Sequence, residues 1–232
     1  MNQLNKEYLQ FLINSGVNDF LDSKPRNFFN KNINTINKSL SEIQTIKELA
    51  EYIELSKNSL KNNANKTVVS DGNKNSQLMI IGEAPGKDED EKGLPFVGKA
   101  GKLLNQMLKA ININRDKIYI TNVVNFRPPN NRKPEVKEIT RYSNYLRKHI
   151  SIIDPKILIL LGSTAMESLF GSNIKISRER GKWKEVIINN KVYLTMVSFH
   201  PAYLLRQPEQ KKHSWTDLKE IRKKIDELKL NI

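Results

Sequence analysis

Short apolar runs alternate along the chain with segments whose apolar residues recur at helical spacing. Residues 78–82 (LMIIG), 117–124 (KIYITNVV) and 156–162 (KILILLG) are strongly apolar runs that predict buried strands. Between them, apolar residues at helical spacing predict one helix around residues 103–108 and another that follows Pro134. Apolar strands that alternate with helices indicate an α/β fold, in which a parallel sheet carries helices on both faces.

The N-terminal part of the chain has the pattern of helices. Residues 4–15 place their apolar side chains on one helical face, and Ser39 with Glu42 forms a capping box that predicts the start of a second helix. We expect residues 1–55 to be an N-terminal helical extension packed on a main domain of residues 56–232.

The C-terminal part combines a hairpin with one more helix. Apolar residues within 186–198 predict two strands that turn at Asn189–Asn190, and the second of them rejoins the sheet. Ser214 with Asp217 predicts the start of a last helix. The stretch 57–75 is rich in Asn and Lys, which predicts a loop.

Composition restricts the kind of protein. The 232 residues carry 39 Lys and Arg against 25 Asp and Glu, a net charge of +14, with an acidic cluster at residues 83–91. This balance is typical of proteins that bind nucleic acids, although a solvated Lys-rich surface gives the same numbers. The chain has no cysteine, which excludes disulfides, thiolate nucleophiles and Cys-ligated metal centres. We expect no metal site, and without a membrane-length apolar run or a secretory leader we expect a cytoplasmic location.

Polar residues follow four predicted strands at the point where each strand ends. Glu83–Gly86 follows the first strand, and Asn122 ends the next. Ser163 and Thr164 follow the third strand, and His200 follows the last. In a parallel sheet these ends meet at one edge, where ligands bind. The first loop (GEAPG) lacks the glycine spacing of a dinucleotide-binding loop and the Gly-Lys-Ser/Thr of a P-loop, so nucleotide chemistry is disfavoured.

Five segments, taken in order, resemble the motif set of the family 4 uracil-DNA glycosylases: GEAPGKDEDEKGLPFVGKAGKLL, TNVVNFRPPNNRKP, PKILILLGSTA, RGKW and SFHPAYLLRQPEQK. The resemblance covers residues 55–220, and the ordered set is far more specific than the GEAPG loop alone. It implies a three-layer α/β/α fold with a central four-stranded parallel sheet. It also implies the activity of that family, hydrolysis of the N-glycosidic bond between deoxyribose and uracil in DNA.

One departure from the family concerns its [4Fe–4S] cluster, which four cysteines bind. The corresponding positions here are Ser56, Ser59, Phe126 and Tyr142, so we expect no cluster and no other cofactor. The aromatic residues at two of these positions suggest that local packing replaces the cluster.

The resemblance gives roles to four residues near the strand ends. Phe96 would stack on a uracil flipped out of the DNA, and the Asn122 amide would pair with uracil O4 and N3–H, a pattern that cytosine lacks. His200 would donate a hydrogen bond to uracil O2 as negative charge develops there, and Glu89 would orient the attacking water. Each residue also has a structural alternative, in the core, in a turn, or on an acidic surface loop.

Further residues are expected to form the pocket wall and the DNA contacts. Glu83, Ala84 and Gly86 would line the uracil pocket, with the Glu83 side chain excluding the thymine methyl group. An apolar wedge of two leucines would enter the duplex, unless these leucines belong to the core. The residues expected to contact DNA are Arg132, Arg180, Leu204, Leu205 and Arg206.

The sequence therefore favours a monofunctional uracil-DNA glycosylase that starts base-excision repair by leaving an abasic site. No lysine is placed as a Schiff-base nucleophile, and residues 177–183 lack the second histidine of relatives that bond covalently to their product. The alternatives are a glycosylase of altered base specificity and a non-catalytic module that binds uracil or single-stranded DNA. The expected partner is uracil-containing DNA, single- or double-stranded, bound by a nucleoid-associated monomer that contacts no membrane.

Overall fold

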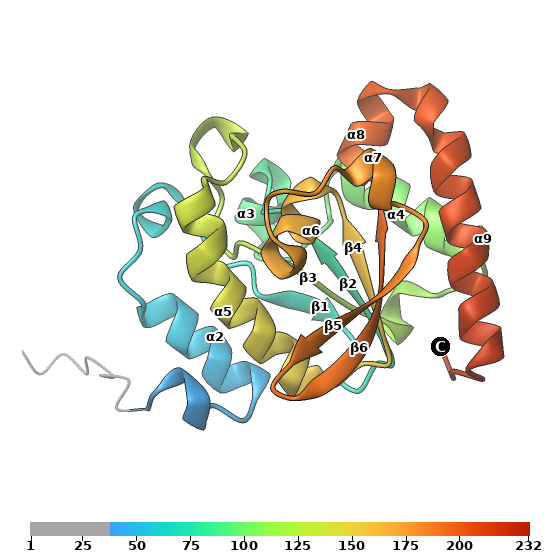
Figure 1. Cartoon of the computed structure of the whole chain (residues 1–232). Coiled ribbons are helices and arrows are strands. Elements are labelled where there is room, and N and C mark those ends of the chain that lie inside the picture. Colours follow the sequence, from blue (N-terminus) through green and yellow to red (C-terminus); the bar gives the residue numbers. More distant parts are fainter. Residues whose placement is uncertain (1–37) are drawn as a thin grey trace, which may run out of the picture. The chain divides into compact units, whose positions relative to one another are not determined.

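The computed structural model describes residues 38–232, which form one α/β unit around a six-stranded sheet (Figure 1). The helix predicted at residues 4–15 lies outside the described residues. The sheet has the order β1-β3-β2-β4-β6-β5. Its strands are β1 (Ser70–Gly72), β2 (Leu78–Gly82), β3 (Tyr119–Asn122), β4 (Ile157–Leu161), β5 (Trp183–Ile188) and β6 (Lys191–Ser198).

The four central strands of this sheet are parallel. β3 pairs with β2, β2 with β4, and β4 with β6, so that Gly82 lies beside Asn122 and Leu161 beside Ser198. The predicted four-stranded parallel sheet is therefore confirmed as the centre of the fold. The edge strands β1 and β5 are antiparallel to their neighbours and extend it to six strands. β1 lies in a stretch predicted as a loop, because its three residues carry no apolar pattern.

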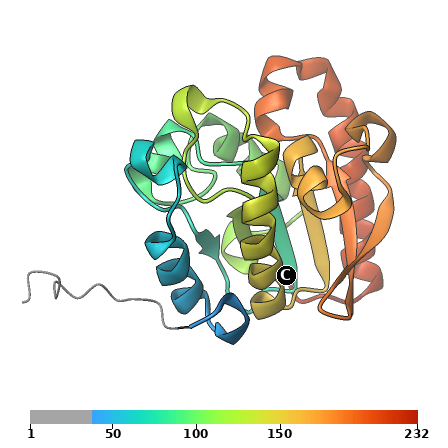
Figure 2. The same cartoon turned by 60° about the vertical axis from the view of Figure 1, so that its left-hand side comes forward.

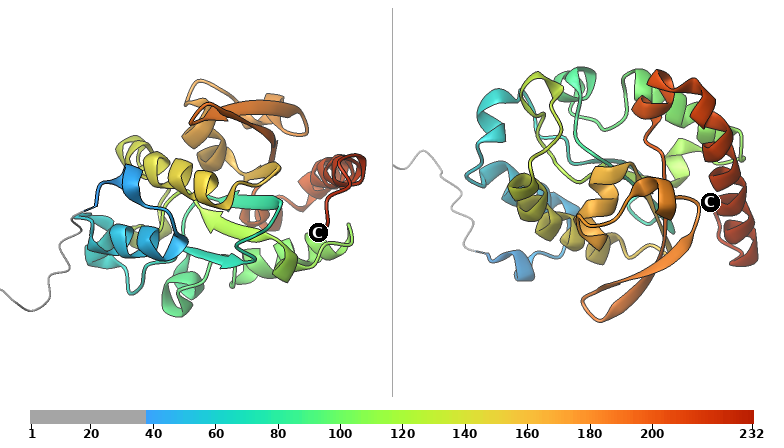
Figure 3. Two further views of the ribbon diagram at one scale, coloured as in Figure 1. Left: turned by 90° about the horizontal axis from the view of Figure 1, so that it is seen from below. Right: turned by 45° about the horizontal axis from the view of Figure 1, so that its top comes forward.

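Helices cover both faces of the sheet (Figures 1 and 3). One layer holds α5 (Val136–Ile153) and α6 (Ser163–Phe170), with α2 (Ile46–Leu55) beside α5; the other holds α4 (Lys99–Lys109) and α9 (Lys211–Glu227). The short helices α3 (Lys87–Lys92), α7 (Ile176–Glu179) and α8 (Pro201–Arg206) lie in the upper half of Figure 1. Single 3-10 turns are η1 (Leu40–Glu42), η2 (Leu60–Asn63), η3 (Arg115–Lys117), η4 (Pro129–Asn131) and η5 (Pro208–Gln210). Among the described helices, none combines the length and apolar character that a membrane span requires.

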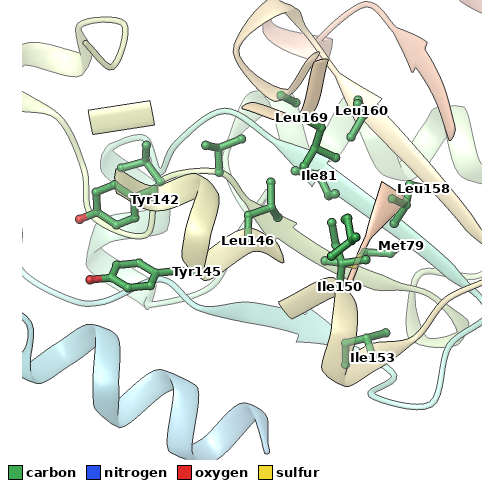
Figure 4. Packing of buried hydrophobic residues seen from close by; sticks show 14 of the residues in the cluster. Met79, Ile81, Tyr142, Tyr145, Leu146, Ile150, Ile153, Leu158, Leu160 and Leu169 are labelled. Carbon is green, nitrogen blue, oxygen red and sulfur yellow. The ribbon is translucent and has the colours of Figure 1, made fainter. Parts of the chain in front are cut away.

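Alternate residues of the strands face the two helical layers. Met79 and Ile81 of β2 pack in one buried cluster with Leu146 and Ile150 of α5 (Figure 4). Ile80, between them in the sequence, belongs to the opposite cluster with residues of α4 and α9. This alternation follows from the two-residue period of a strand, and it explains why a strand buried on both faces is apolar throughout.

The segment 38–55 contributes to the same core. Leu49 and Ile53 of α2 are fully buried against α5, beside which α2 runs in Figure 2. The Ser39–Glu42 capping box is present, but it caps the single turn η1, and a second box, Thr45–Glu48, starts α2. The domain boundary at residue 55 stays a prediction.

Candidate active site

A cavity of about 730 Å³ opens where the parallel strands end. The cavity receives side chains from the ends of β2 and β3, from the loop before α4 and from the start of α8. Segments far apart in the sequence therefore meet at one edge of the sheet, as the order of parallel strands requires. All residues predicted to catalyse or to bind uracil line this cavity: Glu83, Ala84, Gly86, Glu89, Phe96, Asn122 and His200.

The Glu89 carboxylate is held by three backbone amides. Its Oε2 accepts from the amide of Gly86 at 3.1 Å, and its Oε1 accepts from those of Val97 at 2.9 Å and Gly98 at 2.8 Å. Gly86 and Gly98 are the N-caps of α3 and α4, whose positive helix ends favour the negative charge. A carboxylate accepts about four hydrogen bonds, so one position on Oε2 remains for a water molecule.

The neighbouring acidic residues have other positions. Asp90 is completely buried and accepts hydrogen bonds from the backbone amide of Asn65 at 2.8 Å and from its side chain at 2.7 Å. Asp88 is exposed. Of this acidic run in α3, only Glu89 lines the cavity.

Phe96 and His200 form an aromatic wall of the cavity. Their rings stack with centroids 5.5 Å apart and planes inclined by 29°. The edge of the Phe96 ring and the Asn122 amide both lie against Gly82, where a Cβ atom would come within 2.5 Å of Phe96 Cζ and 2.4 Å of Asn122 Oδ1. Glycine at position 82 therefore lets the aromatic ring and the amide approach one another.

The environment of His200 fixes its protonation. The residue is the N-cap of α8, and its Nδ1 accepts a hydrogen bond from the backbone amide of Ala202 at 3.1 Å. Burial, assisted by the positive charge of Arg206, lowers the pKa of His200 to about 4. The imidazole is therefore neutral at physiological pH, and because Nδ1 accepts, the proton is on Nε2.

Two further side chains of the cavity are held by specific partners. Glu83 Oε2 accepts a hydrogen bond from the Thr164 hydroxyl at 2.6 Å, which joins the loop after β2 to the start of α6. Arg132 forms a two-pronged ion pair with Glu138, with both N–O distances at 2.7 Å. This arginine lowers the pKa of Glu138 and still lines the cavity, as does Arg206.

The two leucines predicted as a wedge have different surroundings. Leu204 is 1% exposed and packs in the core with α4 and α9, whereas Leu205 is 44% exposed on the surface of α8. Of the two leucines only Leu205 is exposed, so the predicted wedge can involve Leu205 alone and stays a prediction.

Arg180 lies away from the cavity lining and pairs with a buried carboxylate. Its Nε donates to Asp217 Oδ2 at 3.1 Å, and its guanidinium lies 5.4 Å from the centre of the Phe199 ring. Asp217 also accepts from Ser198 at 2.6 Å, and burial raises the pKa of its carboxyl group.

The prediction that Ser214 and Asp217 start the last helix is wrong, because α9 begins at Lys211.

Several residues of the cavity were not predicted from the sequence. Phe199 and Tyr203 flank His200 within one motif, so their presence could have been inferred from it. Asn131 and Gln210 also lie within the motifs of the resemblance and could have been inferred in the same way, whereas Ile176 and Ser177 enter from α7 and carry no local signal.

The four positions that correspond to cluster cysteines do not fit an iron–sulfur cluster. Phe126 and Tyr142 are fully buried, and Tyr145 meets the Tyr142 ring edge-on with centroids 5.6 Å apart (Figure 4). Ser56 is half-buried and Ser59 is exposed. The side chains at these positions offer no thiolate, and aromatic packing fills the interior next to α5. Within residues 38–232, no three His, Asp or Glu side chains are grouped to hold a metal ion.

Comparison with known proteins assigns the chain to a family. Residues 69–219 match the model of the Uracil DNA glycosylase superfamily. The type-4 uracil-DNA glycosylase of Sulfurisphaera tokodaii is 42% identical over 191 residues, which cover 79% of this chain and 84% of the relative. Those of Archaeoglobus fulgidus and Thermotoga maritima are 40% and 41% identical, covering 65% and 62% of this chain and 77% and 74% of their own lengths. The prediction from the sequence motifs is confirmed: the chain belongs to the uracil DNA glycosylase superfamily and, within it, to the type-4 family.

Proposed function

We propose that this protein removes uracil from DNA by hydrolysing the bond between C1′ of deoxyribose and N1 of the base. The observation that carries the proposal is the convergence of Glu89, Asn122 and His200 on one cavity that Phe96 also lines. The type-4 uracil-DNA glycosylases to which the chain is similar support the same substrate.

Recognition of the base rests on the Asn122 amide and the Phe96 ring. The target nucleotide leaves the base stack at a cost of about a few kcal/mol, which stacking on an aromatic ring in the cavity offsets in part. The Asn122 carboxamide offers one acceptor and one donor, which match uracil N3–H and O4. Cytosine has a donor and an acceptor in the reverse positions, so a fixed amide rejects it. The Glu83 side chain, held by Thr164, closes the wall against the methyl group of thymine.

Bond cleavage separates charge, and two residues stabilise the two parts. The electron pair of the C1′–N1 bond leaves with the base, and His200 Nε2–H donates a hydrogen bond to O2, where negative charge collects. The sugar becomes positively charged, and the negative Glu89 carboxylate stabilises this positive charge. A water on the remaining acceptor position of Glu89 attacks C1′, and its proton passes to solvent. The proposed reaction uses no metal and no cofactor.

The proposed substrate is uracil in single- or double-stranded DNA. The protein is proposed to bind it as a monomer that is associated with the nucleoid. Leu205 on the surface of α8 fills the space that the flipped base leaves in a duplex. Arg132 and Arg206 at the cavity rim contact the flanking phosphates.

The test is base release from matched fluorescent oligonucleotides that differ at one position, which is uracil, thymine or cytosine. The full chain is incubated with each, single-stranded and paired, in EDTA, and abasic sites are then cleaved with alkali. Asn122→Ala and His200→Ala are tested beside Val192→Thr, a control at an exposed position of β6 that pairs with β5.

Strand cleavage at uracil only supports the proposal, provided that it is lost in Asn122→Ala and His200→Ala and kept in Val192→Thr. Release of thymine or cytosine at a similar rate overturns the assigned specificity. Salt-dependent DNA binding without any base release overturns the enzymatic function and favours a binding module.

A further inference from the structure

Phe96 has a backbone conformation that bulky residues rarely adopt. Its φ angle is +53°, in the left-handed region, although its side chain is buried in the wall of the cavity. Residues in that region persist only where their surroundings hold them, and they are concentrated at functional sites. The contacts that hold Phe96 therefore decide where its ring lies.

A single arginine outside the cavity binds the backbone at this point. Arg115, the first residue of η3, donates from NH1 to the Phe96 carbonyl at 3.1 Å and from NH2 to the Pro95 carbonyl at 2.6 Å. NH1 also donates to Asn105 Oδ1 of α4 at 3.0 Å. The planar guanidinium thus links the Phe96 loop to the helix that follows it.

Asp71 of β1 fixes the arginine from the other side. Arg115 Nε donates to Asp71 Oδ2 at 2.9 Å, and NH2 lies 2.8 Å from the same oxygen. All five N–H groups of the guanidinium therefore have an acceptor nearby. With side chains 22% and 31% exposed, the pair is partly withdrawn from solvent, where charge-assisted bonds are stronger than at an open surface.

The Phe96 carbonyl is also confined by α4. A Cβ atom at Gly101 would come within 1.8 Å of this oxygen, so only glycine permits the contact. The carbonyl is therefore bracketed between the Arg115 guanidinium and the backbone of α4. The ring on the same residue stacks on His200.

We propose that Arg115, held by Asp71, is a positioning residue that fixes Phe96 in its left-handed conformation and so presets the ring that receives the flipped base. The proposal rests on the proposed function and adds to it a residue that touches neither base nor DNA. Without the guanidinium, the Pro95 and Phe96 carbonyls lose their shared donor, and the backbone relaxes toward negative φ. The ring then leaves the position from which it stacks on uracil.

A double-mutant cycle tests whether Arg115 acts through Phe96. Arg115→Gln, Phe96→Leu and the double variant are compared for single-turnover uracil release and for affinity toward an oligonucleotide with a non-hydrolysable 2′-fluorinated uridine. Arg222→Gln is the matched control, because it removes an Arg–Asp pair of α9 that lies outside the cavity lining. Arg115→Lys, which keeps the charge without the planar fork, should retain an intermediate rate.

We expect Arg115→Gln to lower uracil release about tenfold or more, since small displacements of a positioning group are costly. In the Phe96→Leu background the same change should have less than about a twofold effect, because the ring that Arg115 positions is already absent. An undiminished effect in that background, or a loss no larger than in Arg222→Gln, overturns the proposal.

A second variant and a second measurement apply if Arg115→Gln is unstable or if the wild type is inactive. If Arg115→Gln lowers the melting temperature below that of the assay, Asp71→Asn replaces it in the same cycle, and an additive result then overturns the proposal. If the wild-type protein releases no uracil, the proposed function fails, and the cycle measured on affinity for the fluorinated oligonucleotide still decides the role of Arg115.

Discussion

His200 is expected to act as a neutral hydrogen-bond donor, and the pH dependence of catalysis tests this directly. Its Nδ1 accepts from the Ala202 amide, and burial lowers its pKa to about 4. A protonated imidazole would lose the acceptor at Nδ1 and with it the contact that holds the ring at the start of α8. The active form is therefore the uncharged one.

A lowered and an ordinary pKa of His200 predict very different neutral fractions of the imidazole at pH 5.5. With a pKa of about 4, roughly 97% of His200 is neutral at pH 5.5. With the ordinary histidine pKa of about 6.5, only about 9% would be neutral at that pH. The neutral fraction between pH 8 and pH 5.5 is thus nearly constant in the first case and falls about tenfold in the second.

Single-turnover uracil release by the wild type and by His200→Ala, measured from pH 5.5 to pH 8, separates these cases. Removal of one hydrogen-bond donor to a developing anion lowers a rate by about 10²–10³-fold, or about 2.7–4 kcal/mol. The ratio of the two rates cancels the titration of other groups, and we expect it to stay constant over this range. A ratio that falls about tenfold toward pH 5.5 would refute the lowered pKa of His200, and a ratio that rises toward pH 5.5 would refute the assignment of a neutral donor.

The remaining predictions concern Leu205 on the surface, His149 in the core and the effect of removing metal ions. Leu205→Ala should slow uracil release from duplex DNA more than from single strands, because a single strand has no gap to fill; equal losses in the two assays would contradict a wedge. Burial lowers the pKa of His149 to about 4, so as the pH falls this imidazole is protonated in the unfolded chain before it is protonated in the folded one, and its contribution to the free energy of unfolding should fall by up to about 3 kcal/mol between pH 6.5 and pH 4. Urea titrations should give a shallower pH dependence for His149→Gln, and an unchanged one would be evidence against this origin. Dialysis against EDTA should leave uracil release unchanged, and a loss that added iron restores would contradict a metal-free reaction.

The position of the site was predictable because it depends on local patterns and one topological rule. β2 and β4 are continuous apolar runs, which only a sheet buried on both faces accommodates. Once these strands are parallel, the residues that follow them must meet, and Glu83, Asn122 and His200 line one cavity.

Contacts between distant segments could not be predicted in this way. Leu204 and Leu205 are chemically identical neighbours, and only the rotation of α8 buries one and exposes the other. Asp217 looked like a helix-starting residue by its spacing from Ser214, whereas its partner Arg180 lies 37 positions away. Pairing at such a separation leaves no periodic trace in the sequence.

The aromatic interior next to α5 affects how this part of the protein folds. Tyr142 is buried there, accepts a hydrogen bond from the Asn58 amide and packs with Phe126 in one cluster. Such packing forms as the chain folds and uses no thiolate ligand. Oxidants that modify thiols find no cysteine in this chain. The fold of this region therefore depends on aromatic packing and not on thiols, so thiol oxidation leaves it unchanged.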